Sequence, residues 1–227
     1  MDSKSAELNG EQRACLAAYW WRRAEGEITS WVAFGHVLQD LRVEHSPSPV
    51  IALAERAVAD EYQHALWCMD WARRFGHPSG TQVRPRSERP LFFSGRSEEE
   101  NRLLRIALCC LTETVGCFLL RLLRPVLTDP ALRELNRRHL ADELQHSRVG
   151  WAHLSTLDER KREFLGAWMP KLLEALPVVC CDGPGEDREE LVPFGYFTPR
   201  LLRAAHSEAV REVILPGLEH NGLRRVA

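Results

Sequence analysis

The chain has 227 residues, with 30 basic and 32 acidic side chains and a formal charge of -2, which is enough length for one domain with a full helical core. Acidic and basic residues are interspersed, so there is no basic stripe for nucleic acid and no polybasic patch for a membrane surface. We therefore predict a single domain over residues 1–227 that binds neither nucleic acid nor membrane.

Residues 1–13 are polar and lack the apolar core of a secretory signal, which predicts a cytoplasmic protein. The most apolar segment, 103–123, is interrupted by Arg105, Glu113 and Arg121, which favours a buried bundle helix over a membrane span. The seven cysteines are odd in number and include no Cys-x-x-Cys pair, so we expect reduced core residues.

Apolar residues recur at helical spacing and no run of four or more alternates strictly, which predicts an all-α protein. The first helix is expected over about 11–44 and ends before Pro47 and Pro49. The second is expected over about 50–75 and ends at the Gly-His-Pro sequence of residues 76–78. Residues 79–95, rich in Pro, Gly and Arg, then form a long connection.

Ser97 and the three glutamates after it predict the start of a third helix, which ends near Leu127. Asp129 and Pro130 predict the start of a fourth, which ends near Thr156. A long crossover between the second and third helices is typical of a ferritin-like four-helix bundle, here over about 11–156. Accessory helices are expected within 157–220, at 157–176 and 198–215, with a loop over 178–193.

Two five-residue segments carry the same chemistry. Residues 60–64 read Asp-Glu-Tyr-Gln-His and residues 142–146 read Asp-Glu-Leu-Gln-His, so each places a carboxylate and an imidazole three residues apart, on one helix face. Each segment also follows a lone glutamate, Glu27 or Glu113, after a spacer of about thirty residues. The repeated pattern is Glu27, Glu61 and His64, then Glu113, Glu143 and His146.

Ferritin-like carboxylate proteins use this set of ligands to hold two metal ions in the bundle core. Four carboxylates in an apolar core would be costly unless cations neutralised them. We therefore predict a dinuclear site. Asp60 and Asp142 are each expected to accept the free ring N–H of the histidine in the opposite segment, because a ligating imidazole needs an acceptor to orient it.

His139 lies four residues before Glu143 on the same stripe of the fourth helix, as either a surface histidine or a third imidazole ligand. Arg23 and Arg121 are candidate partners for a substrate carboxylate. Small residues near the ligands, such as Cys110 and Gly116, either leave room for substrate or pack helices closely. The tryptophans form either core or a dimer face, which leaves a homodimer open; they are Trp20, Trp21, Trp67 and Trp71.

With these motifs, the chain resembles the p-aminobenzoate N-oxygenase family, AurF-like diiron enzymes that oxidise arylamines to nitro compounds. Their signature is a twice-repeated Glu followed by Asp-Glu-x-x-His, with an additional ligating histidine at the position of His139. The resemblance implies Glu27, Glu61 and His64 at one iron. It implies Glu113, His139, Glu143 and His146 at the other, with Glu61 and Glu143 able to bridge.

The resemblance also implies a function, an O2-dependent oxidation of a small, aromatic amine that draws electrons from an external donor. Three alternatives use the same ligands: a ferroxidase, a peroxide scavenger and a diiron C-hydroxylase. Manganese, or a mixed manganese and iron pair, is an alternative to two irons, since sites rich in carboxylate and imidazole accept both metals.

Overall fold

The structure is a computed structural model, and it describes residues 8–86, 95–180 and 187–223, with 177–180 as backbone only. Seven α-helices, two 3-10 helices and one π-helix make up the described chain, which contains no strand, so the predicted all-helical class is confirmed. They are α1 (Gly10–Val43), α2 (Ser48–Arg74), α3 (Glu98–Leu123), η2 (Arg124–Val126), α4 (Pro130–Thr156), α5 (Glu159–Cys180), η3 (Glu189–Phe194), α6 (Pro199–Ala209), η4 (Val210–Ile214) and α7 (Leu215–His220).

The starts of α3 and α4 follow from local sequence. Ser97 accepts a hydrogen bond from the backbone of Glu100, and the Glu100 side chain accepts one from the backbone of Ser97. The Asp129 side chain accepts hydrogen bonds from the backbone N–H groups of Ala131 and Leu132. Both helices begin as predicted because these side chains satisfy backbone donors that a helix leaves unpaired at its first turn.

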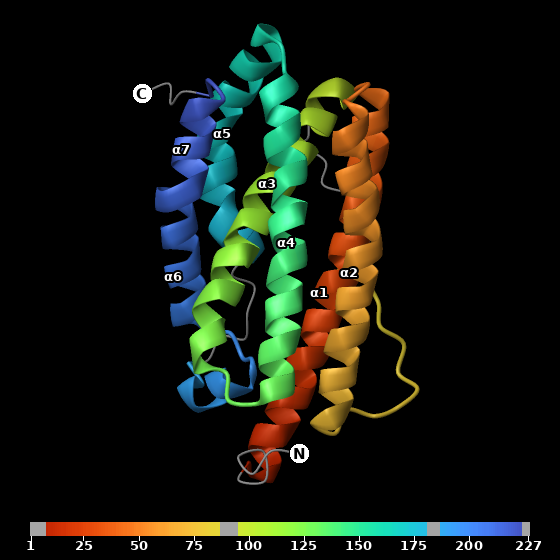
Figure 1. Cartoon of the computed structure of the whole chain (residues 1–227), viewed down its shortest axis with the longest axis vertical. Coiled ribbons are helices and arrows are strands. Elements are labelled where there is room, and N and C mark those ends of the chain that lie inside the picture. Colours follow the sequence, from red (N-terminus) through yellow and green to blue (C-terminus); the bar gives the residue numbers. More distant parts are fainter. Residues whose placement is uncertain (1–7, 87–94, 181–186, 224–227) are drawn as a thin grey trace.

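Four helices form the bundle, as Figure 1 shows. Helix α1 packs against α2 and α3 against α4 as antiparallel pairs, while α2 also contacts α4 and α1 contacts α3. Helix α2 ends at the end of the bundle at which α1 begins, whereas α3 begins at the opposite end (Figure 1). The connection after α2 therefore spans the length of the bundle, although its residues 87–94 lie outside the described part.

Helices α5, α6 and α7 cover the outer side of α3 (Figure 1). Two predictions were wrong here. In the loop expected over 178–193, whose residues 181–186 lie outside the described part, α5 occupies 178–180 and η3 occupies 189–193. The last helix continues beyond residue 215 to His220. The π turn of η4 explains the second error. Its wider turn accommodates the ring of Pro216, which would clash with a carbonyl one turn earlier in a regular helix.

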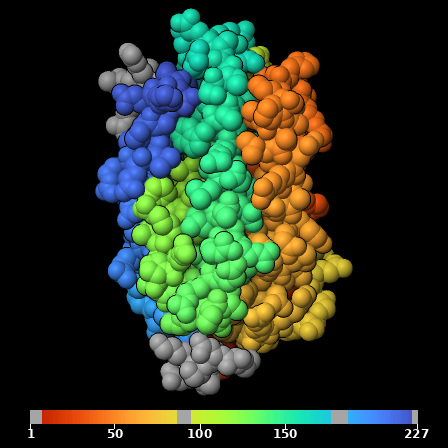
Figure 2. All heavy atoms as spheres, in the orientation of Figure 1, coloured from red at the N-terminus to blue at the C-terminus, as the bar shows by residue number. Residues whose placement is uncertain are grey.

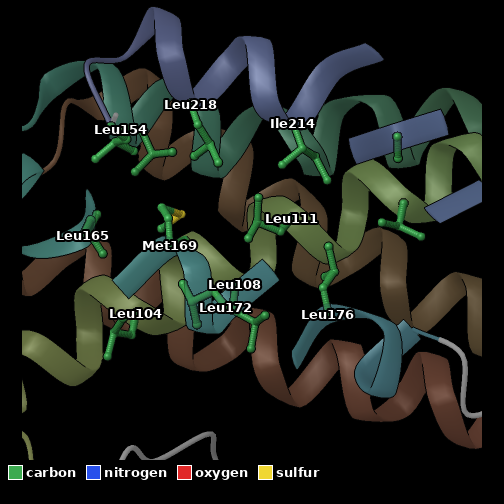
Figure 3. Packing of buried hydrophobic residues seen from close by; sticks show 14 of the residues in the cluster. Leu104, Leu108, Leu111, Leu154, Leu165, Met169, Leu172, Leu176, Ile214 and Leu218 are labelled. Carbon is green, nitrogen blue, oxygen red and sulfur yellow. The ribbon is translucent and has the colours of Figure 1, made fainter. Parts of the chain in front are cut away.

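Apolar residues form three clusters. The first lies between α3 and the C-terminal helices, and Figure 3 shows Leu111 of α3 near Met169 and Ile214 in it. Although the segment Glu98–Val126 is long and apolar enough to cross a membrane, 72% of its most apolar window is buried inside the protein, as in the core helix of a bundle.

The other two clusters lie within the four-helix bundle, one towards each end. One contains Trp20 of α1 and Trp71 of α2, and the other contains Phe34 of α1 and Ala57 of α2. Trp20, Trp21 and Trp71 are buried, so these three tryptophans belong to the core and not to an exposed face. The bundle thus has two apolar ends, with a layer between them.

Candidate metal centre

The predicted ligands lie in the layer between the two apolar clusters of the bundle. On α1, Glu27 lies between Ala24 of one cluster and Phe34 of the other. On α2, Glu61 and His64 follow Ala57, and the next buried residue of the other cluster is Cys68. Because apolar side chains close both ends of this layer, its polar groups face one another.

Two overlapping groups of side chains in this layer could hold metal ions. Ligand atoms of each group lie within 4.8 Å of one another. The first group is Glu27, His64, His139 and Glu143, and the second is Glu61, His64, Glu143 and His146. The structure therefore brings together six of the seven ligands expected from the sequence, drawn from α1, α2 and α4.

Helix α3 supplies the seventh expected ligand, Glu113. This residue belongs to neither group of mutually close ligand atoms, but its carboxyl group hydrogen-bonds to that of Glu143. Its position is set by the close approach of α3 to α4, where Cys110 lies against Gly150. Glu113 is therefore connected to the centre by its contact with Glu143.

The two repeated segments make reciprocal contacts across the bundle. Nδ1 of His146 lies 3.0 Å from Glu61 Oε1, and Nδ1 of His64 lies 3.5 Å from Glu143 Oε1. Within each segment the imidazole and carboxylate are 3.7 Å apart. This approximate two-fold arrangement follows from the antiparallel packing of α2 against α4, which places equivalent residues opposite one another.

The aspartates before the two glutamates take the positions expected of them. Nε2 of His64 lies 3.4 Å from Asp142 Oδ2, and Nε2 of His146 lies 3.4 Å from Asp60 Oδ2. Each aspartate thus contacts the histidine of the opposite segment, through the ring nitrogen that faces away from the carboxylates. The two Nδ1 atoms are left to face the centre.

His139 breaks the two-fold arrangement. It is buried, its Nε2 lies 2.9 Å from Glu143 Oε1 and 3.9 Å from Glu27 Oε1, and its ring lies 3.9 Å from that of His64 between centroids. The equivalent position on α2 is Ala57, which is part of an apolar cluster. The centre therefore has an extra imidazole at one end only.

The structure groups His139 with Glu27, His64 and Glu143, and it groups His146 with Glu61 and the same His64 and Glu143. The ion that His139 would hold, with the Glu113 and His146 set as the resemblance implies or with Glu27, stays a prediction.

The donor set fits a metal cation. Both carboxylate oxygens of Glu61 and the Nδ1 atoms of His64 and His146 are buried without a hydrogen-bond partner among the described residues. Such groups are costly to bury unless something satisfies them. Imidazole nitrogens and carboxylate oxygens that converge in this way are ligands for divalent first-row metals.

Burial and proximity shift the ionisation of the carboxyl groups. Burial raises the pKa of Glu113 well above its usual range, and the neighbouring charge of Glu143 adds to the effect. Burial alone would raise the pKa of Glu143, but the neighbouring Glu113, His139 and His146 side chains outweigh burial and lower this pKa. In the metal-free protein these groups therefore share protons.

The pKa values of the three imidazoles shift in different directions. Burial disfavours a charged His64, yet Glu61 and Glu143 raise its pKa to about 9, and the same two carboxylates raise the pKa of His146 to about 12. Burial and the charge of His64 lower the pKa of His139. A metal ion at the Nδ1 atoms would replace these protons, so metal binding releases protons from the site.

The two arginines singled out in the sequence lie in different surroundings. Arg23 is nearly buried, with Nη2 3.7 Å from Glu27 Oε1 and its guanidinium between the rings of Trp20 and Phe197. Arg121 instead pairs with Glu208 at half-exposed positions, away from the centre. Cys68, Cys109, Cys110 and Cys117 are free, and Cys110 packs closely against Gly150 and leaves no room there for substrate.

Several residues near the centre were not predicted. The Cys68 thiol donates to Glu27 Oε1 at 3.7 Å, and the ring of Trp67 lies 5.2 Å from that of His64. Asn136 is buried one turn before His139, with no partner for either side-chain atom among the described residues. Arg56 contacts both aspartates. A sequence signal existed for Arg56 alone, because arginine precedes the aspartate by four residues in both segments.

Fold and site together define an all-helical protein with a buried cluster of glutamate and histidine that could hold metal ions. No protein-family model, curated protein or solved structure matches the chain.

Proposed function

We propose that the chain is an O2-dependent diiron oxidoreductase of ferritin-like type that N-oxygenates a small, aromatic amine. The observation that carries the proposal is the convergence of three imidazoles and a set of carboxylates in one buried layer, in two overlapping groups whose ligand atoms each lie within 4.8 Å of one another. Ferroxidase-type sites use the same repeated pattern, and His139 is the addition that favours the oxygenase.

The residues divide naturally between two ions. Glu27, His64 and His139 would hold one ion, and Glu113 and His146 the other, with Glu61 and Glu143 between them. This assignment follows the reciprocal contacts across α2 and α4 and the position of His139 beside Glu27. Two iron ions held there would supply electrons for the activation of O2.

The protein's own contribution is to orient the ligands and to exclude water. Asp60 and Asp142 fix the imidazole rings so that Nδ1 faces inward. The apolar clusters at the two ends of the layer keep the site dry, which strengthens electrostatic interactions within it and prevents side reactions. Arg23, held beside Glu27, is the described cation best placed to attract an anionic group on the amine.

Electrons must come from outside the centre. Each N-oxygenation transfers one atom of O2 to nitrogen and releases the other as water, which requires two electrons from a donor. Trp67 is half-buried, and its ring contacts the rings of both His64 and His139. This aromatic contact between the ligands and the surface supports an external electron donor.

The test is to load the protein with two equivalents of Fe2+ without oxygen and mix it with O2, alone and with p-aminobenzoate. Benzoate is the matched control, since it lacks only the amine. We expect the hydroxylamine from p-aminobenzoate when the two Fe2+ ions are the only reductant, nitroso or nitro products when a chemical reductant is added in excess, and none of these from benzoate. Products hydroxylated on the ring would instead indicate the C-hydroxylase.

The ferroxidase gives a different result in the same experiment. It would continue to oxidise added Fe2+ beyond two equivalents and would leave the amine unchanged. A protein that binds no iron at all would overturn the proposal in both forms.

A further inference from the structure

Arg56 contacts both of the aspartates that orient the histidines. Its Nε lies 3.2 Å from Asp60 Oδ2 on the same helix, and its Nη2 lies 3.3 Å from Asp142 Oδ1 on α4. Helices α2 and α4 lie side by side on the face shown in Figure 2. One guanidinium therefore connects the two helices at the outer edge of the centre.

The contacts form a continuous chain. His146 contacts Asp60, Asp60 contacts Arg56, Arg56 contacts Asp142, and Asp142 contacts His64. All four spacings lie between 3.2 and 3.4 Å. Each imidazole in this chain presents its Nδ1 to the centre, so the chain joins a candidate ligand of one ion to a candidate ligand of the other.

We propose that Arg56 is a positioning residue that holds Asp60 and Asp142 together and thereby couples the loading of the two metal positions. The proposal rests on the proposed dinuclear site. Without the guanidinium, two carboxylates that now share it would repel one another across α2 and α4. Each would then orient its histidine less well, so that both metal positions weaken together.

The shape of the arginine side chain suits this role. A guanidinium presents several N–H donors in a planar fork and can serve two carboxylates at once, whereas an ammonium is a compact point charge. Arg56 is 58% exposed, but Asp60 and Asp142 are only 22% and 18% exposed. An isolated exposed ion pair has little effect on stability, so we expect Arg56 to act on the orientation of its partners.

The repeated segments show that this contact is specific to one arginine. Arg138 occupies the equivalent position before Asp142, but its guanidinium lies over the ring of Trp67, 4.7 Å from the centroid. The sequence repeat therefore gives two arginines, and the structure gives each a different contact. Because only Arg56 of the two arginines contacts the aspartates, a substitution of Arg56 tests the proposal.

The experiment titrates Arg56→Gln, Arg56→Lys and the unchanged protein with Co2+, followed by visible absorption and by calorimetry without oxygen. The control is Arg74→Gln, because Arg74 makes the same kind of pair with Asp70 on α2. We expect Arg56→Gln to lose about tenfold in affinity at both positions. Arg56→Lys should fall between, and Arg74→Gln should match the unchanged protein.

A comparison of combined substitutions separates positioning from a general structural role. Asp60→Asn should weaken mainly the ion held by His146, and Asp142→Asn mainly the ion held by His64. The proposal has Arg56 act through both aspartates. Adding Arg56→Gln to a protein that already carries Asp60→Asn and Asp142→Asn should therefore cause little further loss of Co2+ affinity. Thermal unfolding of the metal-free Arg56→Gln protein should stay close to that of the unchanged protein.

Equal Co2+ affinities for Arg56→Gln and the unchanged protein would overturn this inference and leave the proposed function standing. An affinity loss confined to one position would also overturn it, since coupling requires both. If the unchanged protein bound no Co2+ or Fe2+, the proposed function would fail first, and the inference with it.

Discussion

Oε1 of Glu61 on α2 lies 3.0 Å from Nδ1 of His146 on α4, and both side chains are almost completely buried. This contact joins the two repeated segments across the bundle, although neither oxygen of Glu61 has a hydrogen-bond partner among the described residues. A buried carboxylate in this situation is explained if a cation binds between it and its neighbours.

The first prediction concerns the stability that metal adds. A ligand present at a hundred times its Kd adds about 2.7 kcal/mol of stability, which corresponds to a Tm increase of roughly 5–10 °C for a chain of this size. We expect Glu61→Gln to abolish the increase on addition of Co2+, as measured by calorimetry. Glu55→Gln, at an exposed position of α2, should retain it. An unchanged Tm increase in Glu61→Gln would show that Glu61 is not a ligand.

The second prediction separates the two metal positions. His139 contacts Glu27 and His64, which we assign to one ion, so its loss should affect one position only. We expect His139→Ala to weaken one of two Co2+ binding steps about tenfold or more and to change the rate of O2 consumption by the reduced iron-loaded protein. His206→Ala, in the outer layer on α6, is the control. Equal weakening of both steps would contradict the asymmetric assignment.

The ligands were predictable because their signal is local and repeated. Glu61 and His64, like Glu143 and His146, share a helix face at a spacing that any α-helix imposes. The different contacts of Arg56 and Arg138 were not predictable from this local signal, because they depend on which helix lies opposite each side chain.

The C-terminal elements were harder to predict for a different reason. The four bundle helices carry strong boundaries, such as Ser97 and Asp129, which satisfy backbone donors locally. After residue 157 such signals are sparse, and Pro216 suggests an end to the last helix when the π turn before it allows the helix to continue. Tertiary packing against α3 decides the structure there.

The third prediction is a pH dependence of stability due to His153. This residue is 2% exposed, its Nδ1 lies 3.1 Å from Ser46 Oγ, and burial, with Lys161 nearby, lowers its pKa to about 4 although Glu44 opposes the shift. Between the unfolded pKa near 6.5 and the folded pKa, only the unfolded chain binds the proton. The free energy of unfolding therefore falls as pH falls through this window.

The effect is measurable by urea unfolding of the metal-free protein. Going from neutral pH to about pH 5, the contribution of His153 should cost about 2 kcal/mol. His153→Gln should lose less stability than the unchanged protein over the same interval, by about that amount. Identical pH dependence in the two proteins would mean that folding does not lower the pKa of His153.

The fourth prediction concerns Asn136, which is buried on the same face of α4 as His139 with both side-chain atoms unpartnered among the described residues. Removing an unsatisfied buried amide should be favourable, so Asn136→Leu should raise the free energy of unfolding by about 1 to 2 kcal/mol. Asn101 is the matched control, since it is buried but donates to the carbonyls of Arg96 and Ser97. Asn101→Leu should destabilise the protein.

Turnover of an amine gives a second measurement on the same variant. If the reaction uses the amide of Asn136, the Asn136→Leu protein should be more stable than the unchanged protein and should turn over the amine more slowly. A destabilised Asn136→Leu would show that the amide has a structural partner in solution.

The last prediction tests the helix approach that sets the position of Glu113. A Cβ added at Gly150 would overlap the side chain of Cys110 and come within 2.9 Å of its Cα, so α3 and α4 would have to separate. We expect Gly150→Ala to lower the free energy of unfolding by about 1 to 3 kcal/mol and to weaken metal binding, because Glu113 lies one turn from Cys110.

Gly35→Ala is the control, since a Cβ there meets nothing within 4 Å. Because Gly35 lies in the interior of α1, where alanine is a better helix former than glycine, Gly35→Ala should stabilise the protein by about 0.5 to 1 kcal/mol. Urea unfolding with a parallel Co2+ titration measures both effects, and a Gly150→Ala protein with normal stability and affinity would show that the two helices are not held together at this point.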